Sequence, residues 1–153
     1  MSKYQKLSLL LLRLSLGWIF LYSGVTKILN PDWTAIGYLK GAQTFTPLYN
    51  LFAQNIEIIN FLNSWGQAAI GLALILGIML RPAAIGGILM MIFYYIPILH
   101  FPYVGKNPTS LIVDEHVIYS LVFFALFVFD GGEYYGLKTA VKKYLPKSLQ
   151  QYL

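Results

Sequence analysis

Stretches of almost continuously apolar residues alternate along the chain with short polar segments. Each is about as long as a helix that crosses a membrane, which needs about 20 mostly apolar residues. Proline suits the first position of a helix, so Arg81-Pro82 marks a tight turn between the second and third stretches. The pattern predicts an all-α fold, an integral membrane antiparallel four-helix bundle that forms one domain over residues 1–153. The predicted spans are residues 7–28, 62–80, 82–101 and 111–129.

Two segments outside the spans also have a pattern. Residues 45–62 are aromatic and apolar but are interrupted by amides and by Glu57, so they are too polar to span. We expect an interfacial segment there, between the first and second helices, that lies at the membrane surface or caps the bundle. The C-terminal residues 137–153 begin with apolar side chains at helical spacing beside lysines, which predicts a basic amphipathic C-terminal tail on an anionic membrane surface.

Composition and charge agree with a membrane protein. Hydrophobic residues make up 58% of the chain and charged residues 11%, whereas soluble domains carry about 25% charged residues. The absence of cysteine excludes disulfides and thiolate metal sites. Basic residues favour the side of the two termini, so the positive-inside rule predicts a multi-pass protein of the cell membrane with both termini cytoplasmic. That side holds Lys3, Lys6, Arg13, Arg81, Lys138, Lys142, Lys143 and Lys147, and the other holds Lys27, Lys40 and Lys106.

The first span carries a cation near each end of one helical face. Arg13, Gly17, Phe20, Gly24 and Lys27 follow one another at steps of four and three residues. Glycines on this face allow a neighbouring helix to approach closely, so we expect the face to point into the bundle. Either cation could instead only extend to the lipid headgroups.

Arg13 needs a partner if it lies inside the membrane. Asp130, near the end of the fourth span, belongs to the same leaflet, so we expect a structural ion pair between Arg13 and Asp130.

The antiparallel topology gathers polar residues from all four spans in the outer leaflet. Polar and ionisable groups within spans are costly, so they are usually paired or functional. One alternative is purely structural: Lys27 pairs with Glu115 or Asp114 and only locks the helices together. The collected residues are Tyr22, Lys27, Trp65, Gln67, Tyr94, Tyr95, His100, Asp114, Glu115, His116 and Tyr119.

Three motifs resemble the DoxX/DoxD-like membrane proteins. The first span, RLSLGWIFLYSGVTKIL (13–29), is similar to the first-helix signature of that family. GQAAIGLALILGIMLRPAA (66–84) is similar to its second helix and the turn into the third. DEHVIY (114–119), with the exit YGLK (135–138), resembles the fourth helix of the DoxD branch. The chain departs from the pattern at Gln67, where a Glu is common, and at Glu133 and Lys138 in the exit.

The resemblance implies an activity and partners. DoxD-like proteins are the membrane subunit of thiosulfate:quinone oxidoreductase, which oxidises thiosulfate to tetrathionate and passes electrons to membrane quinone. They work with a small DoxA subunit and accompany the terminal oxidase of sulfur-oxidising archaea. Implied partners are therefore membrane lipid, quinone and a small DoxA-like subunit or respiratory oxidase subunits, with no nucleic acid. The alternative from another class is a non-catalytic membrane subunit of a terminal oxidase or other respiratory complex.

The implied chemistry can be assigned to residues. Thiosulfate is a dianion, so Lys27 with His116 or His100 would hold it, and His116, Glu115 and Tyr119 would supply protons. We expect no covalently bound cofactor and no metal, and quinone as the electron acceptor. A haem between His100 and His116 is a less favoured option. Quinone needs an apolar slot with aromatic rings and a few donors, for which the candidates are Trp18, Tyr22, Trp65 and Tyr94. Gln67 is a further substrate-binding candidate.

Overall fold

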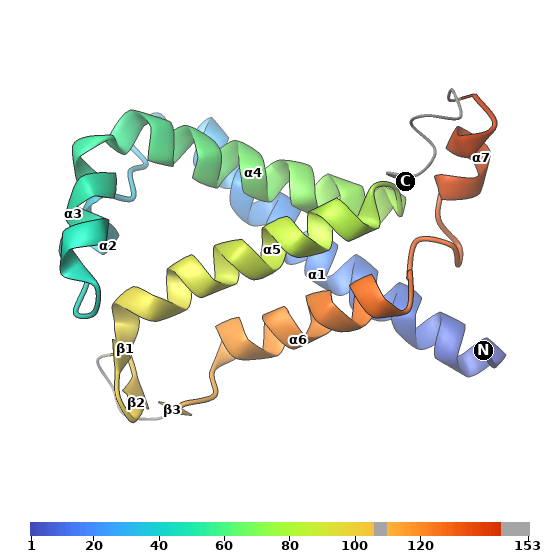
Figure 1. The fold of residues 1–153 in the computed structure, drawn as a ribbon. Helices are drawn as coiled ribbons and strands as arrows, with labels where there is room; N and C mark the ends of the chain where they lie inside the picture. The colour runs from blue at the N-terminus through green and yellow to red at the C-terminus, as the bar shows by residue number, and fades with distance from the viewer. Residues whose placement is uncertain (106–109, 145–153) are drawn as a thin grey trace.

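A computed structural model describes residues 1–105 and 110–144. Four apolar helices run along the molecule, and shorter elements connect them at one end (Figure 1). The helices are α1 (Lys3–Leu29), α4 (Ile56–Leu76), α5 (Leu80–Tyr95) and α6 (Glu115–Val128). The connecting elements are α2 (Ile36–Lys40), α3 (Thr46–Gln54), the 3-10 helix η1 (Ile96–Ile98), strands β1 (Leu99–His100), β2 (Tyr103–Val104) and β3 (Ser110–Leu111), and, beyond α6, α7 (Lys138–Lys142).

Three helices are long and apolar enough to cross a membrane: α1, α4 and α5 continued by η1. This confirms an all-α, multi-pass membrane fold. The fourth predicted span, 111–129, was too long: α6 has 14 residues, or about 21 Å of helix against the roughly 30 Å of a bilayer core. It begins late because Asp114 caps it, accepting hydrogen bonds from the backbone N–H groups of His116 and Val117. A complete four-span bundle stays a prediction, as does the side that each terminus faces.

Glycines seat α1 directly against α4. A Cβ atom on Gly24 would lie 2.4 Å from the backbone nitrogen of Ala68, and one on Gly71 would lie 2.2 Å from that of Leu21. The two backbones therefore touch, which only glycine permits. The expectation that the glycine face of the first helix meets a neighbouring helix is confirmed. Because Gly17 meets Leu74 while Gly24 meets Ala68, the two helices are antiparallel.

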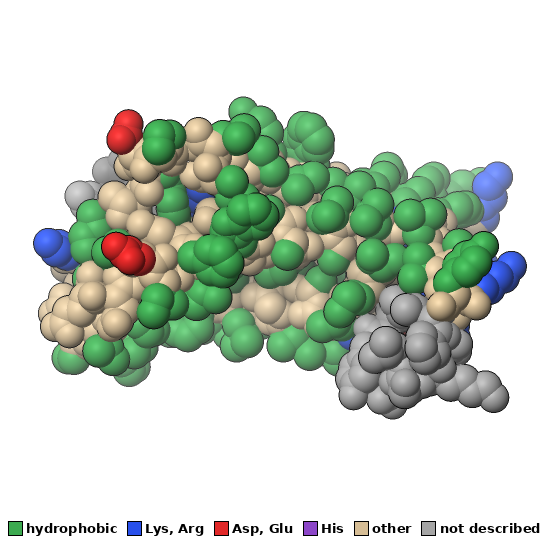
Figure 2. All heavy atoms as spheres, turned by 90° about the horizontal axis from the view of Figure 1, so that it is seen from above, with side chains coloured by type: hydrophobic (Ala, Val, Ile, Leu, Met, Phe, Trp, Pro, Cys, Tyr) green, Lys and Arg blue, Asp and Glu red, His purple; other side chains and the backbone are tan. Residues whose placement is uncertain are grey.

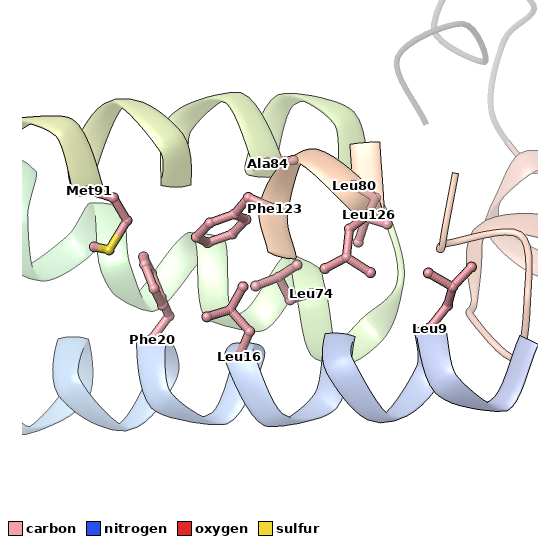
Figure 3. Close-up of a cluster of buried hydrophobic side chains, with 9 residues drawn as sticks. All are labelled: Leu9, Leu16, Phe20, Leu74, Leu80, Ala84, Met91, Phe123 and Leu126. Atoms are coloured by element: carbon pink, nitrogen blue, oxygen red, sulfur yellow. The ribbon is translucent and has the colours of Figure 1, made fainter. Parts of the chain in front are cut away.

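The main core lies where α1, α4, α5 and α6 converge (Figure 3). The rings of Phe20 and Phe123 meet edge to face with centroids 5.0 Å apart. Phe123 also covers Gly87 of α5, where a Cβ would lie 2.2 Å from the ring. Hydrophobic side chains cover the body of the molecule and charged ones gather near its two ends, as expected for a protein surrounded by lipid (Figure 2). The core residues are Leu9, Leu16, Phe20, Leu74, Leu80, Ala84, Met91, Phe123 and Leu126.

Helices α2 and α3 form a cap over one end, with a small core of their own around Tyr49. The sequence predicted an interfacial segment over residues 45–62, but α4 already begins at Ile56. The reason is that Asn60 serves the cap from within α4: its side chain accepts a hydrogen bond from the Ala35 N–H and donates one to the Thr34 hydroxyl. Polar residues of the first turns of α4 are thus used by the cap.

Pro97 ends α5 and fixes the cap to it. Proline has no N–H, so the carbonyl of Phe93, four residues earlier, loses its helical donor. The Tyr49 hydroxyl donates to that carbonyl oxygen at 3.0 Å, and the Tyr38 hydroxyl donates to the carbonyl of Tyr94. The chain then forms the antiparallel sheet β1-β2-β3, where the sequence predicted helix as far as residue 101.

The basic residues near the termini lie together at the other end of the molecule. Helix α7 lies at the same end as the N-terminus (Figure 1), and the Lys6 ammonium lies 4.9 Å from the centre of the Tyr134 ring. Most of the predicted amphipathic tail, with Lys147, and the loop residue Lys106 lie outside the described residues.

Candidate functional site

A cavity of about 390 Å³ opens at the capped end of the molecule. It lies where α1 ends, α4 and α6 begin and α5 ends, beneath the segment that leads into α2. The antiparallel arrangement thus brings these helix ends to one depth, as the topology predicted. The lining residues are Lys27, Trp33, Thr34, Ala35, Tyr38, Asn63, Tyr94, Ile98, Glu115 and His116.

Lys27 reaches this cavity with its charge unneutralised. Its Nζ atom donates to Asn63 Oδ1 at 2.8 Å and to Gln67 Oε1 at 2.6 Å, and both acceptors are neutral amides. Nζ also lies 4.9 Å from the centre of the Trp33 ring and 5.8 Å from that of Tyr94. All the acidic residues of the chain are described, and none forms a salt bridge with Lys27. The alternative of an ion pair with Glu115 or Asp114 is not what the structure shows.

Gln67 is the buried end of this network. Its Oε1 atom also accepts a hydrogen bond from the Ser23 hydroxyl at 3.1 Å. Since Ser23 and Lys27 lie one turn apart on α1, Gln67 ties one face of α1 to α4. The neutral amide orients the lysine without cancelling its charge.

His116, in the first turn of α6, lines the same cavity as Lys27. Its Nδ1 lies 2.7 Å from Asp114 Oδ2, and its ring meets that of Tyr94 edge to face at 6.1 Å. The sequence predicted Glu115 as the carboxylate that acts with His116, but Glu115 is exposed at the rim. Asp114 takes that role because, as the N-cap residue, it folds its side chain back over the first turn. Nε2 of His116 is then the nitrogen available for proton exchange.

Tyr94 offers a free hydroxyl. Its oxygen is buried and has no hydrogen-bond partner among the described residues. Its ring also packs edge to face against Tyr38, with centroids 6.3 Å apart. A buried donor without a partner is rare in proteins and is a candidate contact for a ligand.

Four residues expected in the outer-leaflet site lie elsewhere. Tyr22 is 61% exposed and stacks on Trp18, and Trp65 is 53% exposed beside Phe61, so both face outward from their helices. His100 is exposed on β1 and does not line the cavity, and Tyr119 packs against the main core one turn below His116. Tyr22, Trp65 and Tyr119 lie on faces of their helices that point away from the cavity. His100 lies outside it because the chain forms a strand there instead of continuing the helix. Among residues 1–105 and 110–144, no cluster of His, Asp and Glu could hold a metal ion.

Arg13 and Asp130 do not form the expected ion pair. Arg13 is 1% exposed and donates to the carbonyl oxygens of Gly131 (2.9 Å), Tyr134 and Tyr135 (both 3.2 Å). Asp130 instead accepts from Lys138 Nζ at 2.7 Å. The loop after α6 turns its carbonyls toward Arg13 because Asp130 and Tyr135 adopt positive φ angles. Arg13 is therefore paired inside the protein, but with backbone.

The sequence interpretation missed Trp33, Tyr38 and Asn63 as lining residues. Asn63 lies one helical turn before Gln67 on α4, so its place on the same face was readable from spacing. Trp33 and Tyr38 come from the short connection after α1, where no periodicity indicates which side chains point inward.

Long apolar helices define a multi-pass helical membrane protein, and a small cavity at one end, called here the polar cavity, is lined in part by Lys27, Asn63, Glu115 and His116. A comparison with protein-family models matches residues 8–100 to DoxX, which is more than half of the chain, so the protein belongs to the DoxX family. No curated protein and no solved structure matches the chain. The matched region includes Lys27, Asn63, Gln67 and Tyr94, and ends before Asp114 and His116.

Proposed function

We propose that this protein is the DoxD-like membrane subunit of a thiosulfate:quinone oxidoreductase. Membership of the DoxX family and the resemblance of its motifs to the DoxD branch support the proposal. The observation that carries it is Lys27: an ammonium group at a cavity wall, held by two amides and neutralised by no carboxylate among residues 1–105 and 110–144.

The Lys27 ammonium suits a divalent oxyanion. It has three N–H donors, of which Asn63 and Gln67 take two, so one remains for a ligand in the cavity. A cation near low-dielectric walls attracts an anion more strongly than it would in bulk water. The rings of Trp33 and Tyr94 provide such walls close to Nζ. Thiosulfate, a small dianion with sulfur and oxygen acceptors, fits this arrangement.

The reaction requires both electrons and protons to balance. Two thiosulfate ions join through a new sulfur–sulfur bond to give tetrathionate and release two electrons. Quinone takes up these two electrons and two protons to give quinol. His116 would deliver a proton from Nε2, with Asp114, bonded to Nδ1, stabilising the charged imidazolium during transfer. The hydroxyl of Tyr94 is available to donate to a quinone oxygen.

The proposed orientation places the cavity on the outer side of the membrane. Lys27 and Lys40 are the basic residues of the described chain near the capped end, whereas the N-terminal and α7 lysines lie at the opposite end. By the positive-inside rule the capped end faces outward, with both termini cytoplasmic. Thiosulfate would enter from the outer aqueous phase past the exposed Glu115.

The test is thiosulfate-dependent reduction of a soluble quinone by the purified protein, alone and with its small partner subunit. Lys27→Met and His116→Ala should each reduce turnover by roughly a hundred-fold or more, because each removes a charged or proton-transferring group. Lys40→Met is the matched control: an exposed cation of the same end that lines no cavity. Absence of activity in the wild type with its partner would overturn the proposal and favour a non-catalytic subunit of a respiratory complex.

A further inference from the structure

A second cavity, of about 500 Å³, adjoins the first between the α2–α3 cap and helices α4 and α5. Its lining is almost wholly apolar. The two cavities share the wall formed by Ala35, Tyr38, Asn63 and Tyr94. The remaining lining residues are Leu39, Tyr49, Phe52, Ile59, Leu62, Gly86, Leu89, Met90 and Phe93.

The apolar cavity is accessible from the lipid side. Leu62 and Leu89, which line it, are 56% and 51% exposed on the surface of α4 and α5. These helices are apolar enough to lie in the membrane, so the two lining side chains border hydrocarbon. The polar cavity instead opens beside the charged residue Glu115. A water-soluble ligand and a membrane ligand can thus reach the shared wall by different routes.

Among the tyrosines of the apolar cavity, only Tyr94 has a hydroxyl free for a ligand. The Tyr38 hydroxyl donates to the carbonyl of Tyr94, and the Tyr49 hydroxyl donates to the carbonyl of Phe93. Tyr94 lines both cavities, and its hydroxyl oxygen is buried without a hydrogen-bond partner in the described chain. The site therefore combines one hydrogen-bond donor with a long apolar chamber beside it.

We infer that a lipid quinone binds across this wall, with its ring at Tyr94 and its isoprenoid chain in the apolar cavity. The inference rests on the proposed function, because it takes quinone as the electron acceptor and assigns its place. A ring carbonyl accepts from the Tyr94 hydroxyl, and the chain removes apolar surface from water or lipid at little polar cost. Thiosulfate at Lys27 and the quinone ring then lie on the two sides of one tyrosine.

The chemistry that the apolar cavity recognises is a hydrocarbon chain, which a quinone or a phospholipid can supply. The unpartnered Tyr94 hydroxyl favours the quinone, whose ring carbonyl lies directly at the head of the chain.

Binding can be followed by quenching of Trp33 fluorescence. Trp33 lines the polar cavity, whereas Trp18 and Trp65 are exposed and can be replaced by Phe to leave a single reporter. A quinone with a long isoprenoid chain and a quinone without a chain are titrated into the detergent-solubilised protein. Leu89→Gln places a polar group in the apolar cavity. Ile85→Gln is the matched control, because Ile85 is 50% exposed on the same helix and lines neither cavity.

The expected result is that Leu89→Gln weakens binding of the long-chain quinone by roughly ten-fold and leaves the chainless quinone unchanged. Ile85→Gln should change neither. Tyr94→Phe should weaken both quinones, because it removes the donor to the ring. Equal effects of Leu89→Gln and Ile85→Gln, or displacement of the long-chain quinone by an equimolar phospholipid, would overturn the inference.

This experiment separates the inference from the proposed function. If the long-chain quinone binds in a Leu89-dependent way but the protein shows no thiosulfate-dependent turnover, the quinone site stands and the proposed thiosulfate activity fails. Turnover with chainless quinone, but no effect of Leu89→Gln on binding, would leave the activity and remove the site for the chain.

Discussion

Arg13 and Lys27 lie on the same face of α1, yet the protein uses their charges in different ways. The Arg13 guanidinium is enclosed by three backbone carbonyls of the loop after α6 and is 1% exposed. The Lys27 ammonium is held by two side-chain amides and borders a cavity. Neither cation pairs with a carboxylate in the described structure.

The difference follows from the partners of each cation. A guanidinium has a planar set of donors that can satisfy several carbonyls at once, so Arg13 joins the start of α1 to a loop far away in the sequence. Lys27 has a spare donor and an open side. A buried cation surrounded by the chain is therefore an anchor, and a cation that borders a cavity is available to an anion.

Replacing Arg13 by Leu should have the largest effect on folding. It leaves the buried carbonyl of Gly131 and the partly buried carbonyls of Tyr134 and Tyr135 without their donor, so the free energy of unfolding should fall by about 3 kcal/mol or more. Arg81→Leu is the control: Arg81 is 57% exposed and lies 3.6 Å from Asp130, so its loss should cost less than about 1 kcal/mol. Thermal unfolding in detergent measures both. Equal losses would contradict the anchoring role of Arg13.

The close seat of α1 on α4 holds both cations in place, and Gly71→Ala tests it. A Cβ atom at this position would lie 2.2 Å from a backbone nitrogen, so the helices must separate. We expect a loss of about 1–3 kcal/mol in stability together with weaker ligand binding at Lys27. Gly66→Ala, on the same helix, meets only the flexible end of Met90 at 3.2 Å and should be neutral or stabilising. Unaltered unfolding of Gly71→Ala would show that the helices are not packed backbone to backbone.

Gln67→Glu should remove the net charge that Lys27 presents to the cavity, so that Lys27 becomes a paired cation, as Arg13 is. The new carboxylate would lie where the amide oxygen now accepts from Lys27 Nζ at 2.6 Å, and it would neutralise the charge. Thiosulfate binding, measured by calorimetry, should weaken by roughly ten-fold, while the unfolding temperature stays the same or rises. Unchanged affinity in this variant would mean that the anion does not depend on the net charge of Lys27.

Tyr49 should give a smaller, pH-dependent effect. Burial raises the pKa of Tyr49 to about 12, so the folded protein keeps this hydroxyl protonated at pH values where the unfolded chain, with a pKa of about 10, has lost the proton. Its contribution to stability is complete below about pH 10 and is lost as the pH rises toward 12. Tyr49→Phe should cost about 1 kcal/mol at neutral pH. Between pH 10 and 12 the stability of this variant should fall less steeply than that of the wild type, which chemical unfolding at several pH values would reveal.

The sequence was sufficient where one residue type has one physical consequence. Glycines spaced along one face of α1 can only serve close packing, and the structure confirms that they do. Long apolar runs likewise predicted α1, α4 and α5 as membrane-type helices. The end of a run is less informative: residues 111–113 are apolar, but Leu111 belongs to β3 and all three precede the Asp114 cap.

Contacts with loops could not be predicted from the sequence. The partner of Arg13 is a set of carbonyls whose direction depends on the positive φ angles of Asp130 and Tyr135, and neither residue is a glycine that would indicate such a turn. Trp33 and Tyr38 reach the cavity from a connection without periodicity. The antiparallel topology nevertheless predicted that Lys27, Gln67, Tyr94 and His116 would come to one depth, and the structure gathers them around one polar cavity.

The most direct test of Lys27 as the anion site is calorimetric titration of thiosulfate into the purified wild type and Lys27→Met. Lys27→Met should remain folded, because the lysine bonds only to neutral amides and its removal leaves no unpaired negative charge. We expect saturable binding of thiosulfate to the wild type and an affinity that is weaker by roughly ten-fold or more in Lys27→Met. Lys40→Met should bind as the wild type does. Equal affinity of the wild type and Lys27→Met, or no binding to the wild type, would contradict the claim that Lys27 is the anion site.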